Sequence, residues 1–95
     1  MIYVLIEREI AADKMTAYEE AARKLLNNAY RTVGFVDGQT YTEKDNPLRR
    51  FTLSKWQTVD QWEHWYTSEE RRAQLAQLSP MLADEERITI LQTAE

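Results

Sequence analysis

Three tryptophans lie within ten positions of the sequence, at Trp56, Trp62 and Trp65, and Tyr66 follows directly. Aromatic rings in such a group can hold a flat apolar ligand, while a few polar groups beside them fix its orientation. Trp62, Trp65 and Tyr66 have the i, i+3, i+4 spacing of one helix side, which is also typical of a helix that packs on a sheet. Two interpretations are therefore open, in which these rings line a pocket or only form the core.

Charged side chains near the ends of predicted elements are the candidates for acid–base and anion chemistry. Glu7 and Arg8 end the first predicted strand, His64 lies within the tryptophan run, and Arg71 follows a predicted helix start. A carboxylate or an imidazole can move a proton, and a guanidinium can stabilise an anion. All four also have a plainer interpretation as surface charges, and His64 lies off the aromatic side of its helix.

The composition limits other kinds of site. The chain has no cysteine, which excludes disulfides, thiolate nucleophiles and cysteine-bound metals. Its two glycines, Gly34 and Gly38, do not form a phosphate-binding loop, and its single histidine belongs to no recognisable metal-ligand spacing. We expect neither a metal nor a cofactor.

The charge and length indicate the class of protein. A formal net charge of −4 argues against nucleic acid as a partner, because nucleic-acid binders need a cationic surface. The apolar run at residues 2–6 is too short to cross a bilayer. We expect one domain over residues 1–95, no membrane association and a cytoplasmic location, which the lack of cysteine also suits.

The hydrophobic spacing predicts the element order β-α-β-β-α-β. Strands are expected over residues 2–8, 35–43, 50–56 and 87–92, and a first helix over 15–29. Gly34 is expected to be a left-handed cap of that helix. Simple alternation in the second strand puts Phe35 and Tyr41 on one face and Thr40 on the other.

The second helical region carries two capping boxes. Thr58-Val59-Asp60-Gln61 predicts where it begins, and Thr67-Ser68-Glu69-Glu70 predicts that it stops and restarts near Ser68. Ser79-Pro80 should bend or end the second part, because proline cannot continue a helix.

This element order, with two right-handed crossovers, predicts an α+β ferredoxin-like fold with strand order 4-1-3-2 and helices on one face of the sheet. The first strand is apolar at Ile2, Val4 and Ile6 and also at Tyr3 and Leu5. Burying each such side chain contributes about 1.5–3 kcal/mol, so we expect a second copy of the chain to cover the open face. The alternative is a first strand that leaves one face partly exposed.

Three motifs carry a resemblance to a known family: Gly34-Phe35, then Ser54-x-Trp56-x-Thr58, then Trp62-x-x-Trp65-x-x-Ser68-x-Glu70. Together they resemble the antibiotic biosynthesis monooxygenase (ABM) domain of the dimeric α/β-barrel superfamily. The resemblance spans the chain and implies a dimer with sheets face to face and a pocket between sheet and helices. Some members oxygenate aromatic polyketides or quinols without metal or flavin, others degrade heme, and many have no known substrate.

Residues that define the branches of the family are different here. Heme-degrading members have an Asn late in the first strand and a His on the last helix, whereas this chain has Glu7 and Arg8 and no His over residues 69–78. Quinol oxygenases usually carry His where Trp65 stands. Polyketide anthrone oxygenases place Asn and Tyr ahead of a tryptophan that matches Trp56, and here those two positions hold other residues.

Two functions follow as hypotheses. One is a cofactor-free monooxygenase for a small quinol- or anthrone-like aromatic, and the other is a non-catalytic, dimeric ligand-binding or stress-related module. For the enzyme, the candidates to hold the ring are Trp56, Trp62, Trp65 and Tyr41. The candidates to stabilise an anion or move a proton are Arg8, Arg71, Glu7 and His64.

Overall fold

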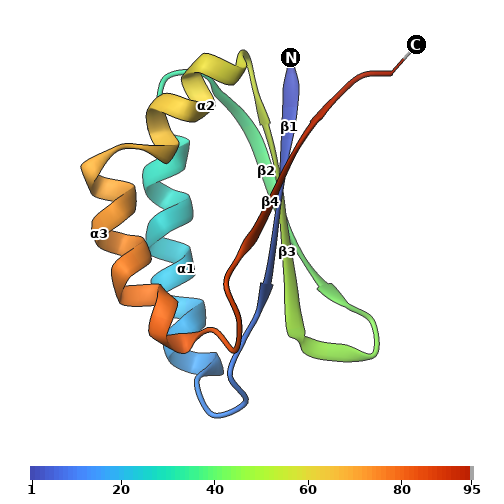
Figure 1. Ribbon diagram of the computed structural model, residues 1–95, viewed down its shortest axis with the longest axis vertical. Coiled ribbons are helices and arrows are strands. Elements are labelled where there is room, and N and C mark those ends of the chain that lie inside the picture. Colours follow the sequence, from blue (N-terminus) through green and yellow to red (C-terminus); the bar gives the residue numbers. More distant parts are fainter. Residues whose placement is uncertain (95) are drawn as a thin grey trace.

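Four strands form one antiparallel sheet, and the helices lie against one of its faces (Figure 1). The computed structural model describes residues 1–94. Its elements are β1 (Ile2–Glu9), α1 (Met15–Tyr30), β2 (Phe35–Glu43), β3 (Asn46–Trp56), α2 (Val59–Tyr66), α3 (Glu69–Leu78), the 3₁₀ helix η1 (Ser79–Met81) and β4 (Arg87–Gln92). This is the predicted α+β ferredoxin-like fold.

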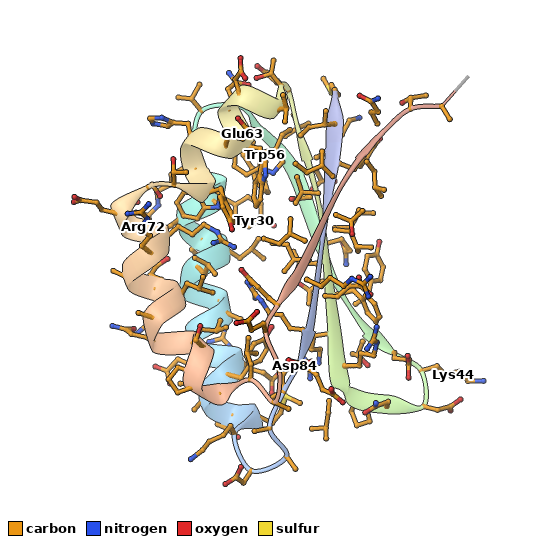
Figure 2. The ribbon with its side chains drawn as sticks, in the orientation of Figure 1. Tyr30, Lys44, Trp56, Glu63, Arg72 and Asp84 are labelled. Carbon is orange, nitrogen blue, oxygen red and sulfur yellow. The ribbon has the colours of Figure 1, made fainter. Side chains whose placement is uncertain are left out.

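The strand order is β2-β3-β1-β4, as predicted. β1 is central, and its first residue, Ile2, pairs with Trp56 of β3 and with Gln92 of β4. The predicted bounds of β4 are confirmed. β3 begins four residues earlier than predicted, because Glu43 pairs with Asn46 and closes the hairpin around a turn at residues 44–45. Lys44 lies at the tip of that hairpin (Figure 2).

Both predicted helix starts are found, but the second is capped by Ser68, one residue after the Thr67 that opens its predicted box. The Thr58 hydroxyl accepts a hydrogen bond from the Gln61 amide at 3.2 Å at the start of α2. The Ser68 hydroxyl accepts one from the Arg71 amide at 3.2 Å at the start of α3. These caps satisfy amides that have no partner within the helix, so the split of the helical region is confirmed. α3 ends at Leu78, directly before Ser79-Pro80, as predicted.

The predicted faces of β2 are wrong at its first residue. The register against β3 shifts between Phe35 and Asp37, which is a β-bulge that adds one residue to β2. Phe35 therefore turns toward the helices and contacts Trp56 edge-on, with ring centroids 5.3 Å apart. Thr40 shares this face, whereas Tyr41 is half exposed and does not.

Gly34 has a positive φ of 96°, but it does not cap α1 as predicted. The helix ends at Tyr30, and its C-cap Arg31 is right-handed. Gly34 instead forms the turn into β2, where its carbonyl accepts a hydrogen bond from the Gln57 amide at 2.8 Å. A Cβ at this position would collide with the Gln61 side chain, so glycine is needed both for the backbone and for space.

The core lies between the sheet and the helices, and its fully buried members include Val4, Ile10, Trp56 and Leu78. Alternation along β1 and its pairing with β3 and β4 place a second set of apolar residues on the opposite face. That set consists of Tyr3, Leu5, Phe51, Leu53 and Leu91. No helix within residues 1–94 covers this face (Figure 1), and none is long and apolar enough to cross a membrane.

Candidate functional site

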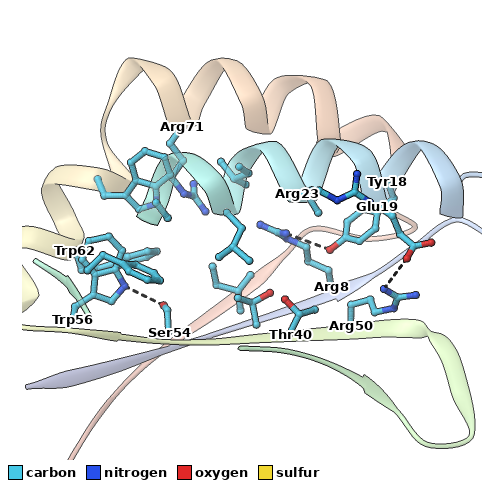
Figure 3. Close-up of a pocket in the computed structure, with 18 residues that line it drawn as sticks. Arg8, Tyr18, Glu19, Arg23, Thr40, Arg50, Ser54, Trp56, Trp62 and Arg71 are labelled. Carbon is cyan, nitrogen blue, oxygen red and sulfur yellow. Dashed lines mark hydrogen bonds and ion pairs between the residues drawn. The ribbon is translucent and has the colours of Figure 1, made fainter. Parts of the chain in front are cut away.

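A cavity of about 270 Å³ lies between the sheet and the helices (Figure 3). Strands β1, β2 and β3 form its floor, and α1, α2 and α3 form the opposite wall. This volume lies just below the roughly 300–1,000 Å³ of most ligand pockets, so the cavity suits only a small molecule. It opens to solvent beside α1, where Glu19 and Arg23 are exposed.

Aromatic rings form one end of this cavity. Trp56, Trp62 and Trp65 all line it, and the rings of Trp56 and Trp62 meet edge-on with centroids 5.6 Å apart. The Trp56 indole donates a hydrogen bond from Nε1 to Ser54 Oγ at 3.0 Å, which fixes the ring (Figure 3). The three tryptophans are at most 5% exposed. The two interpretations of the sequence therefore hold together, because these core residues also form a cavity wall.

Two arginines of the cavity share one carboxylate that lies behind the wall. Arg8 of β1 donates from Nε to Glu86 Oε2 at 3.0 Å, and Arg71 of α3 donates from Nη2 to Glu86 Oε1 at 2.8 Å. Arg8 also donates from Nη1 to the Tyr18 hydroxyl at 3.3 Å. Arg71 lies over the rings of Trp62 and Tyr66, at 5.8 and 4.7 Å from their centroids. Two buried positive charges are thus held by a single negative charge.

This pairing shifts the acid–base equilibria of the cluster. Burial disfavours the charged form of Glu86, but Arg8 and Arg71 outweigh it and hold the pKa of that carboxyl below its usual value. Burial likewise disfavours the charged form of Arg8, yet Tyr18 and Glu86 outweigh it, and the Arg8 pKa is raised. Both groups remain charged at neutral pH.

Polar side chains gather at the other end of the cavity (Figure 3). Arg50 of β3 lies 3.8 Å from the Glu19 carboxylate and donates from Nε to the Pro47 carbonyl at 3.1 Å. Arg23 of α1 and Thr40 of β2 line the same end. Among residues 1–94, no group of three potential ligand side chains is placed to hold a metal ion.

The structure brings five of the eight site candidates from the sequence to the cavity, namely Arg8, Arg71 and the three tryptophans. Glu7 points to the opposite face of the sheet, where it accepts a hydrogen bond from Arg49 at 3.1 Å. His64 is exposed on α2, and Tyr41 is exposed on β2. Alternation explains Glu7, since Arg8 next to it faces the helices together with Val4 and Ile6.

Sequence reasoning did not identify Tyr18, Glu86 or Ser54 as site residues. Tyr18 has the apolar spacing of α1, and that spacing gives no sign of what its hydroxyl binds. A detectable sign of Glu86 was present, because alternation places Arg8 on the buried face of a central strand, and a buried cation requires an anion. The sequence could not choose that anion among the three acidic residues at positions 84–86.

Comparison with known proteins gives the family. The sequence matches the family described as "Antibiotic biosynthesis monooxygenase" over residues 1–77. A search of curated proteins found no match.

Solved structures agree on the fold. A conserved protein from Methanosarcina mazei Go1 has a TM-score of 0.92 at 20% identity, over 98% of this chain and 92% of that one. A Nitrosomonas europaea protein that carries the antibiotic biosynthesis monooxygenase name has 0.89 at 16% identity, over 100% of both chains. SnoaB, a cofactor-independent oxygenase from Streptomyces nogalater, has 0.85 at 12%, over 99% and 94%. With its fold and the match over most of its length, the chain belongs to the antibiotic biosynthesis monooxygenase family.

Proposed function

We propose that this protein is a cofactor-independent monooxygenase that acts on a small quinol- or anthrone-like aromatic in the cavity between sheet and helices. The observation that carries the proposal is the cavity itself, which joins a wall of tryptophans to buried, fully charged arginines. Membership of the family supports it, as does the fold shared with an oxygenase that needs no cofactor.

The chemistry is that of a substrate that reduces oxygen itself. An anthrone-type carbon loses a proton, and the resulting anion passes one electron to O₂. The carbon radical and superoxide combine to a peroxide anion, which takes up one proton from solvent, loses water and leaves a carbonyl group. One oxygen atom of O₂ enters the product and the other leaves as water, so no external reductant is needed.

The protein has three tasks in this reaction. Arg8 and Arg71 stabilise the substrate anion, because their charges act in a site that is shielded from water. The tryptophan wall holds the ring and keeps water out. Glu19, the carboxylate among the residues that line the cavity, takes the proton and passes it to solvent at the opening. Glu7 and His64 lie outside the cavity and take no part.

A non-catalytic ligand-binding module is the second candidate. The observation that favours it is the nearly complete burial of the three tryptophans, which is what a packed core requires. In that case the cavity would bind an aromatic molecule without turnover.

Oxygen uptake separates the two candidates. The parent protein should consume O₂ faster than buffer alone with anthrone or a reduced naphthoquinol, and ¹⁸O₂ should place one labelled atom in the product. Arg8→Gln should lower the rate at least about tenfold, which corresponds to about 1.4 kcal/mol of lost transition-state stabilisation. The matched control, His64→Gln, should retain the parent rate. If O₂ uptake is no faster than in buffer with either substrate, the oxygenase is refuted and the binding module remains.

The proposal includes a homodimer, formed by two copies that pack the uncovered faces of their sheets together. Its support is the set of apolar side chains that alternation places on that face in β1, β3 and β4. A patch of this kind on a sheet is typical of an interaction surface.

A further inference from the structure

Positive charge dominates the cavity of an acidic protein. Its lining includes four arginines, Arg8, Arg23, Arg50 and Arg71, against the single carboxylate of Glu19. The chain as a whole has a formal net charge of −4. When Glu86 is counted because it pairs with two of these arginines, two positive charges remain in excess. Arg23 is exposed, so its charge is solvated, but Arg8 and Arg71 are buried with one carboxylate between them. A buried excess of charge is costly unless a counter-charge is present.

The charges are also unevenly placed within the cavity. Figure 3 shows Trp56 and Trp62 at one end and Arg8, Arg50 and Arg23 with Glu19 and Tyr18 toward the other. Arg71 lies at the aromatic end, where its guanidinium contacts the Trp62 and Tyr66 rings and Glu86. The three arginines at the polar end face the cavity with one carboxylate among them.

Arg8 is the best placed of these three to bind an anion. It is 7% exposed, and its Nε and Nη1 bonds to Glu86 and Tyr18 hold the guanidinium in one orientation. Its Nη2 has no acceptor among residues 1–94. The Tyr18 hydroxyl accepts the bond from Arg8 and so keeps its own proton for a further acceptor. Two fixed donors are therefore available at the polar end.

Arg50 adds a second cation at the same end. It lies beside Arg8 in the sheet, since the two residues pair across β1 and β3. Its separation of 3.8 Å from Glu19 is longer than a hydrogen bond, and the Glu19 side chain is 50% exposed. An ion pair of this kind is weak and easily exchanged for another anion.

We propose that the natural ligand is an aromatic carboxylic acid, with its ring against Trp56 and Trp62 and its carboxylate at Arg8, Tyr18 and Arg50. This rests on the proposed function and narrows its substrate class. A carboxylate matches the planar donors of a guanidinium and supplies the missing counter-charge. A neutral aromatic of the same shape fills the apolar end but leaves the charge excess unpaired.

The test is the affinity for two probes of nearly the same shape, a charged acid and its neutral amide. Calorimetric titration under nitrogen compares 2-naphthoate with 2-naphthamide at pH 7.5. The acid should bind at least about tenfold more tightly than the amide, as expected for a charge-assisted hydrogen bond in a desolvated site. Equal affinities, tighter binding of the amide, or no binding of the acid at millimolar concentration would overturn the proposal.

Three variants test which arginines cause the preference for the acid. Arg8→Gln and Arg50→Gln should each reduce the preference for the acid to about threefold or less. Arg72→Gln removes the same charge from an exposed side chain that points away from the sheet (Figure 2), and it should keep the parent preference. Arg50 lies nearer the opening, so its variant keeps the test valid if Arg8→Gln unfolds. A preference that survives in both folded cavity variants would contradict the assignment.

Binding and turnover can fail separately. Under nitrogen no oxygenation occurs, so the preference for the acid measures the ligand class alone. A protein that prefers 2-naphthoate but never consumes O₂ supports the ligand class and refutes the oxygenase. A protein that oxidises a neutral anthrone but shows no preference for the acid supports the oxygenase and refutes the ligand class.

Discussion

At the scale of single residues, Glu86 is the shared counter-charge of two buried arginines. Its carboxylate is the acceptor for both Arg8 and Arg71. Removing one member of a buried ion group costs more than the pair itself contributes, because the remaining charge loses its counter-charge. Glu86→Gln should therefore destabilise the protein by about 3–5 kcal/mol at pH 7, measured by urea unfolding. Glu85→Gln, at the exposed neighbouring position, should change stability by less than about 0.5 kcal/mol.

The lowered pKa of Glu86 also predicts how stability changes with pH. A carboxyl whose pKa is lower in the folded state stabilises the protein above its unfolded value, near 4.5. That stabilisation is lost as the pH falls through the folded pKa. Between pH 6 and pH 3, the parent should lose more stability than Glu86→Gln does. Parallel pH curves for the two proteins would show that folding does not lower the Glu86 pKa.

Trp62 tests whether a cavity wall is also core. The ring is 3% exposed and contacts Trp56 and Tyr66. Trp62→Ala should cost about 3–5 kcal/mol in urea unfolding, because truncation of a buried ring leaves a cavity that neighbours fill only in part. Tyr66→Ala, at a residue 44% exposed, should cost clearly less. A loss below about 1 kcal/mol for Trp62→Ala would mean that the ring is loosely packed.

At the scale of secondary structure, the start of α3 depends on the side chain of Ser68. Its hydroxyl accepts a hydrogen bond from the Arg71 amide, and the Arg71 side chain in turn binds Glu86. Ser68→Ala should lower the free energy of unfolding, measured by thermal unfolding, by about 1 kcal/mol, as for other N-caps. Ser79→Ala, at the other end of the same helix, is the control, because no side-chain cap bond is formed there. Equal effects of the two changes would contradict a capping role.

Sequence patterns predicted the helix ends well where residues at the end itself, such as caps and proline, determine it. The two capping boxes and the proline after Ser79 mark helix ends through contacts with near neighbours. β2 was different, because its bulge between Phe35 and Asp37 depends on how β2 aligns with β3, and alternation within one strand cannot reveal it. The wrong face for Phe35 follows from this.

The candidate site was predictable in part for a similar reason. The tryptophans and Arg8 come from regular elements, where periodicity shows which side is buried. Glu86 lies in the segment between η1 and β4, and its partners are 78 and 15 residues away. A residue outside regular structure has no periodicity, so only the folded chain shows what it binds.

At the scale of the whole molecule, the uncovered face of the sheet leads to the proposed dimer. Leu5 of β1 and Leu53 of β3 pair at the centre of this face. A stable interface of this kind should bury about 2,000 Å² or more in total. Sedimentation equilibrium at low micromolar concentration should therefore give twice the 11.3 kDa of one chain.

A charge at the centre of that face should separate the two copies. Leu5→Glu should give a monomer or an unfolded chain, because the interface cannot hold an unpaired carboxylate. Val33→Glu introduces the same charge at a residue that is 79% exposed in the loop between α1 and β2, and it should leave the mass unchanged. A parent protein that sediments as a single chain would refute the dimer.

The central place of β1 in the sheet has a consequence for how the chain reaches its fold. β1 is the first strand in the sequence, yet its two neighbours are β3 and β4, and Ile2 pairs with residues 54 and 90 positions away. Closing such long loops is what slows folding in proteins with mainly non-local contacts. During synthesis the most apolar strand therefore leaves the ribosome well before either partner exists. We expect this strand to be the segment that a chaperone must shield until the last strand arrives.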